Sequence, residues 1–373
     1  MRALAVAIAV VACVRAPAEV KPDPATASDD ATRLDAAIHA SGERLRALAR
    51  ADGSFLYEYR VRDGEPIAGY NIVRHAGAIY ALAMFEHVAP DPRTREVIAR
   101  TTKFLVGAIR PLASPSETSA IYGMAAPGEL ADDAVLGATG LGLVALIAAD
   151  SLEPDAVPAD TLRALGNFLV FMQNSDGSFH STYTAEAGPS NRFDSLYYPG
   201  EAILALAQLA AHDRDPRWHD AALRGIRYLA TTRASGGDVP SDNWAVVATE
   251  ELLRQGGLDD DDRELLAHHA AQIAAVNTST QNADPKSALF GCYTDDGRTT
   301  PSSTHLEGLL AAAAILPHEM LAPSIDAGIH FLLVSMLPDG AMPADQRKRT
   351  VRIDYIQHAL SAFIRYRAFE ARK

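Results

Sequence analysis

Ionisable side chains lie one or two turns inside segments that otherwise have the composition of apolar helices. The stretch Val351–Leu360 alone carries Arg352, Asp354, Gln357 and His358. Burying such groups without partners costs several kcal/mol, so they must pair with one another or line a wet cavity. Residues of this kind recur in six segments: Asn71, Arg74 and His75; Asp132 and Asp133; Asp194, Tyr197, Tyr198 and Glu201; Asp242, Asn243 and Trp244; Thr304, His305 and Glu307; and Arg352, Asp354, Gln357 and His358.

The carboxyl groups of this set indicate one chemistry, the cleavage of a glycosidic bond. Such hydrolysis needs two carboxyl groups on opposite sides of the sugar ring. Candidates come from four different segments: Glu201, Asp242, Glu307 and Asp354. Neighbouring residues suit a sugar, because aromatic faces stack on its C–H surfaces and polar groups take its hydroxyls. These substrate-binding candidates are Asn71, Arg74, Tyr197, Tyr198, Trp244, Arg352 and Gln357.

The histidines indicate a second chemistry in the same place. In a lyase or epimerase, a base removes the proton next to a carboxylate while a cation neutralises that carboxylate. His75, His305 and His358 are candidate bases. Arg74 and Arg352, together with helix N-termini, favour an anionic ligand such as a uronic acid. Hydrolase, lyase and epimerase therefore all stay open, with an acidic polysaccharide as the expected substrate.

Part of the set has a purely structural explanation. A polar residue at a helix N-cap is worth about 1 kcal/mol, and five residues stand where a helix is expected to begin. They are Asp132, Asp194, Asp242, Ser302 and Ser303. Capping does not explain ionisable residues deeper in the helices, so those are the stronger site candidates.

Two kinds of helix alternate along the chain. Six segments begin with polar residues and continue as Ala/Leu-rich runs that are apolar on every face, which is typical of interior helices. They start at Tyr70, Asp132, Asp194, Ser241, Ser302 and Arg352. The amphipathic helices between them cover residues 32–50, 93–109, 159–173, 217–232, 262–276 and 322–336.

This alternation predicts an all-α protein made of six helical hairpins. A closed (α/α)6 toroid, with inner and outer helices alternating, would bring the polar beginnings of all inner helices to one mouth. An open solenoid of the same hairpins is the alternative. The sequence therefore predicts that the candidate residues gather at one end of a ring.

Asp-Gly loops follow several of the outer helices and carry a family resemblance. They occur within 42–59, 166–183 and 328–343. The run Gln173–Phe179, QNSDGSF, is similar to the Q-x-x-x-G-x-[FW] repeat of terpenoid cyclases. Residues 30–370 as a whole resemble the α/α toroids of those enzymes, protein prenyltransferase subunits and six-hairpin glycosidases and lyases. Only this repeat keeps the glutamine, so the resemblance implies the fold and leaves the chemistry open.

Other functions find weaker support. A D-x-D-D pattern at Asp259–Asp262 matches that of class II terpenoid cyclases, but it stands before an outer helix, where acids favour the N-terminus. The aromatic content of 7% is low for a cavity that stabilises carbocations. No metal or other cofactor is expected, since the inner helices carry no HxxxH, HxxE or CxxC pair, and Cys292 is expected to pack a loop. A toroid that binds a glycan or a protein without catalysis is the main alternative.

The N-terminal residues predict export. Residues 1–12 have the charge, apolar run and small residues of a signal peptide, and Val10–Cys13 resembles a bacterial lipobox. Cleavage there would leave a lipidated Cys13, a tether over 13–28 and a toroid domain over 29–373. Val14 favours the outer membrane, with the protein facing the periplasm or the cell surface. An ordinary secretory signal is the alternative.

Net charge limits the partners of the protein. The chain has a formal charge of −13 and no stripe of Lys and Arg. Nucleic-acid phosphates would be repelled by such a surface, so a nucleic-acid partner is not expected. The only membrane contact we expect is through the lipid anchor.

Overall fold

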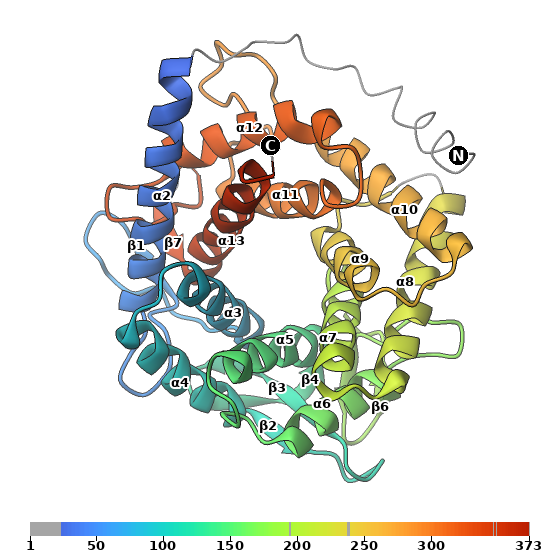
Figure 1. The fold of residues 1–373 in the computed structure, drawn as a ribbon. Helices are drawn as coiled ribbons and strands as arrows, with labels where there is room; N and C mark the ends of the chain where they lie inside the picture. Colours follow the sequence, from blue (N-terminus) through green and yellow to red (C-terminus); the bar gives the residue numbers. More distant parts are fainter. Residues whose placement is uncertain (1–23, 194, 237–238, 346, 348, 373) are drawn as a thin grey trace.

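The computed structural model describes residues 24–193, 195–236, 239–345, 347 and 349–372, with the backbone alone for 24–31 and 234–236. Within these ranges the chain forms a ring of helices in two layers (Figure 1). The predicted signal peptide and lipidated Cys13 lie outside the described residues. None of the described helices has the length and apolar character that crossing a membrane requires.

The inner layer consists of α3 (Ile72–Val88), α5 (Leu136–Leu152), α7 (Tyr198–Asp213), α9 (Asn243–Gln255), α11 (Thr299–Ala312) and α13 (Ile353–Glu370). Each packs against the next, and α13 packs against α3. The outer layer consists of α2 (Pro24–Ala47), α4 (Pro92–Val106), α6 (Ala159–Phe171), α8 (Pro216–Gly236), α10 (Asp260–Ser279) and α12 (His318–Ser335). The contact between α13 and α3 closes the ring, so the predicted (α/α)6 toroid is confirmed and the open solenoid is wrong.

Inner helices are apolar all round because each meets two neighbours and the outer layer. In α5, every residue from 136 to 147 is buried. Glycine allows the backbones to approach closely: a Cβ atom on Gly200 would lie 2.7 Å from the backbone nitrogen of Ala245 in α9. A larger residue at Gly200 would push α7 and α9 apart.

Asp-Gly loops pack the outer helices against one another, because each loop follows one outer helix and contacts another. Gly177 in QNSDGSF has a φ of +96°. A Cβ atom there would lie 2.4 Å from the carbonyl oxygen of Arg224 in α8. Gly340 has a φ of +82° and approaches the carbonyl oxygen of Ala40 in α2 in the same way. The last loop thus packs on the first outer helix, and only glycine combines this conformation with this proximity.

A second glutamine repeats the role of the first. Gln173 Nε2 donates to the Ala221 carbonyl oxygen in α8 at 2.9 Å. Gln281 Nε2 donates to the Ser324 carbonyl oxygen in α12 at 2.8 Å and to that of Gly291 at 3.1 Å. The expectation that only one repeat keeps the glutamine is therefore wrong. Extra residues between Gln281 and Gly291 hid the second copy in the sequence.

Two antiparallel sheets lie in the connections from outer to inner helices, and the sequence analysis missed both. One pairs β1 (Glu58–Arg60) with β7 (Thr350–Arg352). The other has the order β2 (Ile109–Pro111), β3 (Ser119–Ala126), β4 (Glu129–Val135), β5 (Thr182–Thr184) and β6 (Gly188–Ser190). Pro127 and Gly128 form the turn between β3 and β4, which is a hairpin signal that could have been recognised.

The helix beginnings correct several predicted caps. Asp132 lies in β4, and α5 begins only at Leu136 without a side-chain cap. Ser302 and Ser303 lie inside α11, where their hydroxyls donate to backbone carbonyls of the preceding turn. Asp242 is a true N-cap of α9, since it accepts from the backbone nitrogen of Ala245 at 3.1 Å. Asp194 lies outside the described residues.

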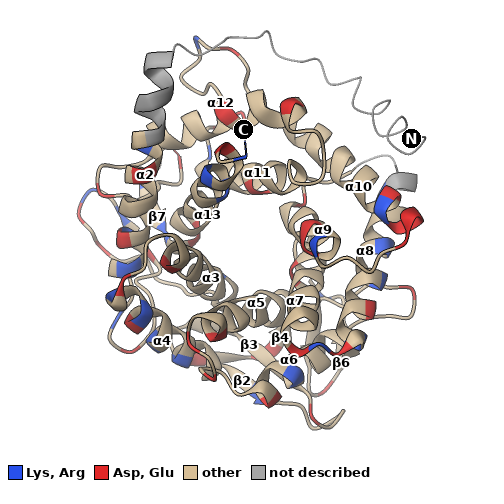
Figure 2. Ribbon diagram, in the orientation of Figure 1, with Lys and Arg blue, Asp and Glu red and all other residues tan. Residues whose placement is uncertain are grey.

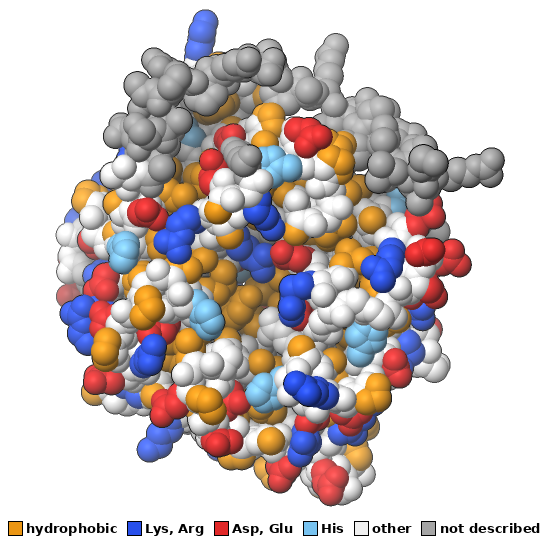
Figure 3. Space-filling view, viewed as in Figure 1, with side chains coloured by type: hydrophobic (Ala, Val, Ile, Leu, Met, Phe, Trp, Pro, Cys, Tyr) orange, Lys and Arg blue, Asp and Glu red, His pale blue; other side chains and the backbone are white. Residues whose placement is uncertain are grey.

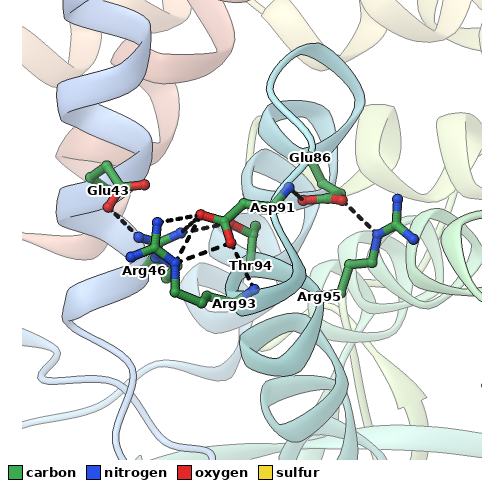
Figure 4. A network of polar contacts seen from close by, with 7 residues as sticks. All are labelled: Glu43, Arg46, Glu86, Asp91, Arg93, Thr94 and Arg95. Carbon is green, nitrogen blue, oxygen red and sulfur yellow. Dashed lines mark hydrogen bonds and ion pairs between the residues drawn. The ribbon is translucent and has the colours of Figure 1, made fainter.

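Charged residues lie mainly on the outer helices and loops (Figure 2). Figure 4 shows one network, in which Arg46 of α2 donates to Asp91, the N-cap of α4, at 2.7 Å. Hydrogen bonds from Arg93 lower the pKa of Asp91. Glu86 of α3 accepts from Arg95 at 2.6 Å. The network ties two outer helices to an inner one.

Candidate functional site

A cavity of about 810 Å³ opens among the N-terminal ends of the inner helices. All six inner helices line it, and each does so only with residues of its first two turns. The cavity is thus at the mouth predicted from the sequence, and it ends inside the ring. Viewed as in Figure 1, hydrophobic side chains fill much of the centre of the ring (Figure 3). Its lining includes the candidates Asn71, Arg74, Tyr197, Tyr198, Glu201, Trp244, Arg352, Asp354, Gln357 and His358.

Asp354 is held between two arginines. Arg74 Nε lies 3.1 Å from its Oδ2 atom. Arg352 Nε lies 2.6 Å from Oδ1, and the Nη2 atom of the same arginine donates to Oδ2 at 3.0 Å. Arg74 also donates to the Tyr57 hydroxyl, and Arg352 lies over the Tyr355 ring. Glu58 Oε2 also lies 3.9 Å from Arg352 Nη1, so the two guanidinium groups face two carboxylates in this part of the cavity.

His358, on the next turn of α13, pairs with a carboxylate from α11. Its Nδ1 atom lies 2.7 Å from Glu307 Oε2. The carboxylate accepts this hydrogen bond, so Nδ1 carries the proton, and Nε2 has no hydrogen-bond partner within the described part of the chain. Burial is the largest single influence and lowers the pKa of His358, but the charge of Glu307, its hydrogen bond and the charge of Asp354 together raise it above the ordinary value. An imidazole held in this way, with a free Nε2, has the arrangement of a general base.

Glu201 enters the same cavity from α7 without a cation beside it. The side chain is only 4% exposed, and its Oε2 atom has no hydrogen-bond partner among the described residues. Burial, followed by the nearby charge of Asp242, raises the pKa of Glu201 well above 4.5. Gly137 of α5 makes room for it, because a Cβ atom there would lie 2.4 Å from Oε2. These surroundings favour the protonated acid, which can donate a proton.

Further polar atoms of the lining lack partners. Asn243 Oδ1 and Thr300 Oγ1 are buried and form no hydrogen bond among the described residues. Buried polar atoms in native proteins are nearly always satisfied, so these acceptors suit a ligand that supplies hydroxyl donors. The Trp244 ring lies beside His358, with 6.3 Å between the ring centroids.

Some candidates do not line the cavity. His75 is fully buried, with Nδ1 2.7 Å from the Tyr70 hydroxyl and Nε2 3.0 Å from the Thr101 carbonyl oxygen. Burial lowers the pKa of His75 to about 4, so it is neutral at pH 7. Both its nitrogens have partners in the packing of α3 against α4, which gives this histidine a structural role.

His305 and Asp242 do not line the cavity, and both have partners within the protein. His305 Nδ1 lies 2.6 Å from the Pro301 carbonyl oxygen, and the ring stacks on Tyr293 at 5.3 Å. Asp242 is fully buried and pairs with Arg233 at 2.8 Å. Glu307 does not line the cavity either, but it reaches the site through His358.

Loop residues complete the lining, and the sequence analysis missed them. Glu58, Phe193 and Arg298 all reach the cavity from the connections between outer and inner helices. The predicted site residues came from helical segments only. Phe193 carried a signal, since it is the one aromatic residue in the polar run Gly188–Ser195.

The remaining motifs are placed away from the cavity. Among the described residues no group of three or more His, Cys, Asp or Glu side chains could hold a metal ion. Asp259 caps α10, and Asp262 pairs with Arg227, so the D-x-D-D pattern belongs to a helix N-terminus. The buried Cys292 Sγ atom lies 3.3 Å from the Ser302 hydroxyl in loop packing.

Comparison with known proteins identifies the chain as an α/α toroid. No protein-family model matches it, and no characterised protein matches its sequence. Among solved structures, D-mannose isomerase has a TM-score of 0.68 at 12% identity, over 90% of this chain and 98% of that one. Cellobiose 2-epimerase from Bacillus thermoamylovorans has 0.68 at 11%, over 90% and 99%. The GH76 α-mannanase of Bacteroides thetaiotaomicron has 0.62 at 11%, over 90% and 96%. At such identities the similarity establishes the fold alone.

Proposed function

We propose that this protein is a carbohydrate-active enzyme that moves a proton at a sugar carbon next to a carbonyl or carboxylate group. Epimerases, isomerases and polysaccharide lyases all share this step. The observation that carries the proposal is the hydrogen bond between His358 and Glu307 at a cavity that also holds Glu201 and Arg74.

The proposed step assigns one role to each group. His358 Nε2 takes the proton from the carbon, and Glu307 stabilises the imidazolium that forms. Arg74 donates to the carbonyl or carboxylate oxygen on which negative charge develops, and Glu201 is the acid. In an epimerase or isomerase, the intermediate regains a proton on the opposite face or on the neighbouring carbon. In a lyase, the electron pair expels the oxygen of the glycosidic bond, which takes its proton from Glu201.

Hydrolysis by two carboxyl groups has less support. Such a mechanism needs a second carboxyl free to act on the far side of the sugar. Both oxygens of Asp354 are engaged by arginines, Glu307 by His358, and Asp242 by Arg233. Of the four carboxyl candidates, Glu201 alone lines the cavity without an ion pair among the described residues.

A sugar is the substrate class that fits the lining best. The unpartnered acceptors suit hydroxyl groups, and Phe193 and Tyr198 offer aromatic faces. The isomerase, the epimerase and the mannanase with the same fold support this choice by analogy. Arg74, whose side chain is 37% exposed, can donate to a sugar carboxylate, so we keep the acidic polysaccharide expected from the sequence as the proposed substrate. We also propose that Cys13 anchors the enzyme outside the cytoplasm.

Proton exchange in heavy water tests the proposed function. The protein is incubated with neutral aldoses, ketoses and uronate oligosaccharides, and NMR follows the loss of C–H signals next to the carbonyl or carboxylate. We expect exchange with at least one sugar in the wild type and none with the His358→Gln variant. Ultraviolet absorbance of an unsaturated uronate in the same samples distinguishes a lyase from an epimerase or isomerase.

Sugar binding without proton exchange would contradict the proposed activity. If sugars bind the cavity but no carbon-bound proton exchanges and no unsaturated product forms, the enzyme proposal is wrong and the binding toroid is favoured. Anchoring is tested separately by replacing Cys13 with alanine, which should release the protein from the membrane fraction.

A further inference from the structure

Hydrophobic exposure is concentrated at one side of the cavity mouth. Among the described residues, the large hydrophobic side chains with more than a third of their surface exposed are Phe193 (54%), Leu196 (38%), Tyr197 (38%) and Val334 (49%). The first three belong to the connection between β6 and α7, and Phe193 and Tyr197 line the cavity. Exposed aromatic side chains gathered at a pocket rim are typical of a binding surface.

These aromatic residues continue into the cavity. The Phe193 and Tyr198 rings lie 5.9 Å apart, between centroids, at 52° to each other. Tyr198 lies in the first turn of α7, one turn before Glu201 along the lining. A ligand that extends outward from Glu201 therefore passes Tyr198 before it reaches Phe193.

The interior of the cavity has the opposite character. Arg74, Asp354 and His358 make its far wall polar and charged, as the reaction on one sugar ring requires. The cavity ends after two turns of the inner helices, so a polysaccharide cannot pass through the ring. An oligosaccharide that enters the cavity by its end places one ring near His358 and the next ring toward the rim.

From these observations we infer that Phe193 and Tyr197 form a stacking subsite for a second sugar ring, so the substrate is the end of an oligosaccharide and not a free monosaccharide. This inference rests on the proposed function for the identity of the reacting ring. It adds that a second sugar ring is recognised by residues outside the catalytic groups. Burying the exposed face of Phe193 under a sugar is expected to strengthen binding by about tenfold.

Matched sugar pairs test the subsite by calorimetry and saturation-transfer NMR. The probes are cellobiose with glucose, mannobiose with mannose, and digalacturonate with galacturonate. We expect at least one disaccharide to bind about tenfold more tightly than its monosaccharide. Phe193→Ala should reduce this ratio toward one, and Phe193→Trp should restore it. Val334→Ala, a change at an exposed hydrophobic residue away from the cavity, should leave the ratio unchanged.

The two proposals fail in different ways. If carbon-bound protons exchange but Phe193→Ala leaves the affinity ratio unchanged, the subsite is wrong and the enzyme proposal stands. If the ratio falls in Phe193→Ala while no proton exchanges with any sugar, the subsite stands and the enzyme proposal fails. If none of the probes binds, or if Phe193→Ala instead dissolves a dimer seen by light scattering, the aromatic residues serve another partner and the inference is overturned.

Discussion

Two walls of the cavity differ in whether their buried polar groups have partners within the protein. On the α13 wall, Asp354 pairs with two arginines and His358 pairs with Glu307. On the α7 wall, to which the neighbouring helix α9 contributes Asn243, the atoms Glu201 Oε2 and Asn243 Oδ1 have no partner among the described residues. The first wall is satisfied by the fold itself. The second is incomplete, and its unsatisfied atoms reduce stability until a ligand supplies the missing hydrogen bonds.

The difference separates two kinds of functional residue. Paired groups set charge and orientation before substrate arrives, as a preorganised base and its counter-ion require. Unpaired groups are held in a state that costs free energy, which is expected where a side chain must bind or protonate substrate. Variants on the α13 wall should therefore lose stability, as well as activity where the base His358 is removed. Variants on the α7 wall should lose activity without a loss of stability.

The largest expected effect is on turnover when His358 is replaced. His358→Gln keeps a side chain that can hydrogen bond to Glu307 but removes the base, so turnover of the best substrate should fall by about 10²–10⁴-fold. Steady-state kinetics on the sugar identified by proton exchange measures this. His75→Gln is the control, because His75 is buried outside the cavity; the ring-packing loss there should lower the melting temperature while turnover per folded molecule persists. Equal losses of turnover in both variants would contradict the assignment of the base.

Glu201→Gln should separate activity from stability as pH changes. Turnover should fall, because the amide cannot donate a proton as an acid. The pKa of Glu201 is raised in the folded state, so above pH 4.5 the unfolded chain ionises while the folded protein stays protonated, and the wild type loses stability as pH rises. Each pH unit in this window costs about 1.4 kcal/mol, and Gln at this position does not titrate.

Denaturant unfolding at several pH values measures this linkage. The stability of Glu201→Gln relative to the wild type should rise steadily from pH 4.5 until the folded pKa of Glu201 is reached, and then level off. A difference in stability that is constant with pH would show that Glu201 is ionised in the folded protein. It would then be unsuited to act as the acid.

The architecture was predictable because hydrophobic patterns repeat along the chain. An inner helix such as α5 is apolar on all sides, an outer one such as α4 on one side only, and this contrast depends on local sequence alone. The mouth was predictable for the same reason, since Arg74 and His358 interrupt apolar helices near their beginnings. Gln281 was overlooked because its repeat is interrupted, although its hydrogen bond in the structure matches that of Gln173.

The individual partnerships could not be derived from the sequence. His75 and Arg74 are adjacent on α3, yet one packs against α4 and the other lines the cavity, because successive helix positions point about 100° apart and the rotation of α3 depends on all its neighbours. The pairing of His358 with Glu307 depends on how α11 and α13 are rotated against each other, which the residue spacing within either helix does not determine. Phe193 lies in a loop, where no periodicity indicates direction.

Asp354→Asn tests whether the ion pairs of the α13 wall stabilise the protein. The amide leaves Arg74 and Arg352 without their carboxylate, and both arginines are partly exposed, so solvent compensates for part of the loss. We expect a decrease of about 1–3 kcal/mol in the free energy of unfolding, measured by denaturant titration. If Asp354→Asn were as stable as the wild type at pH 7, the claim that the paired groups of the α13 wall stabilise the protein would be wrong.

The smallest expected difference comes from two tyrosine hydroxyls, one bonded to Arg74 and one on the α7 wall. Tyr57 accepts a hydrogen bond from Arg74, whereas Tyr198 has no hydrogen bond to another described residue and touches Phe193 through its ring. Tyr57→Phe removes an acceptor that a charged donor uses, so it should cost about 1 kcal/mol more than Tyr198→Phe in thermal or denaturant unfolding. Both changes keep the aromatic ring, so each variant serves as a control for packing effects in the other variant. A larger loss of stability in Tyr198→Phe than in Tyr57→Phe would mean that the Tyr198 hydroxyl is hydrogen-bonded within the protein. The contrast between a wall with paired groups and a wall with unpaired groups would then be wrong.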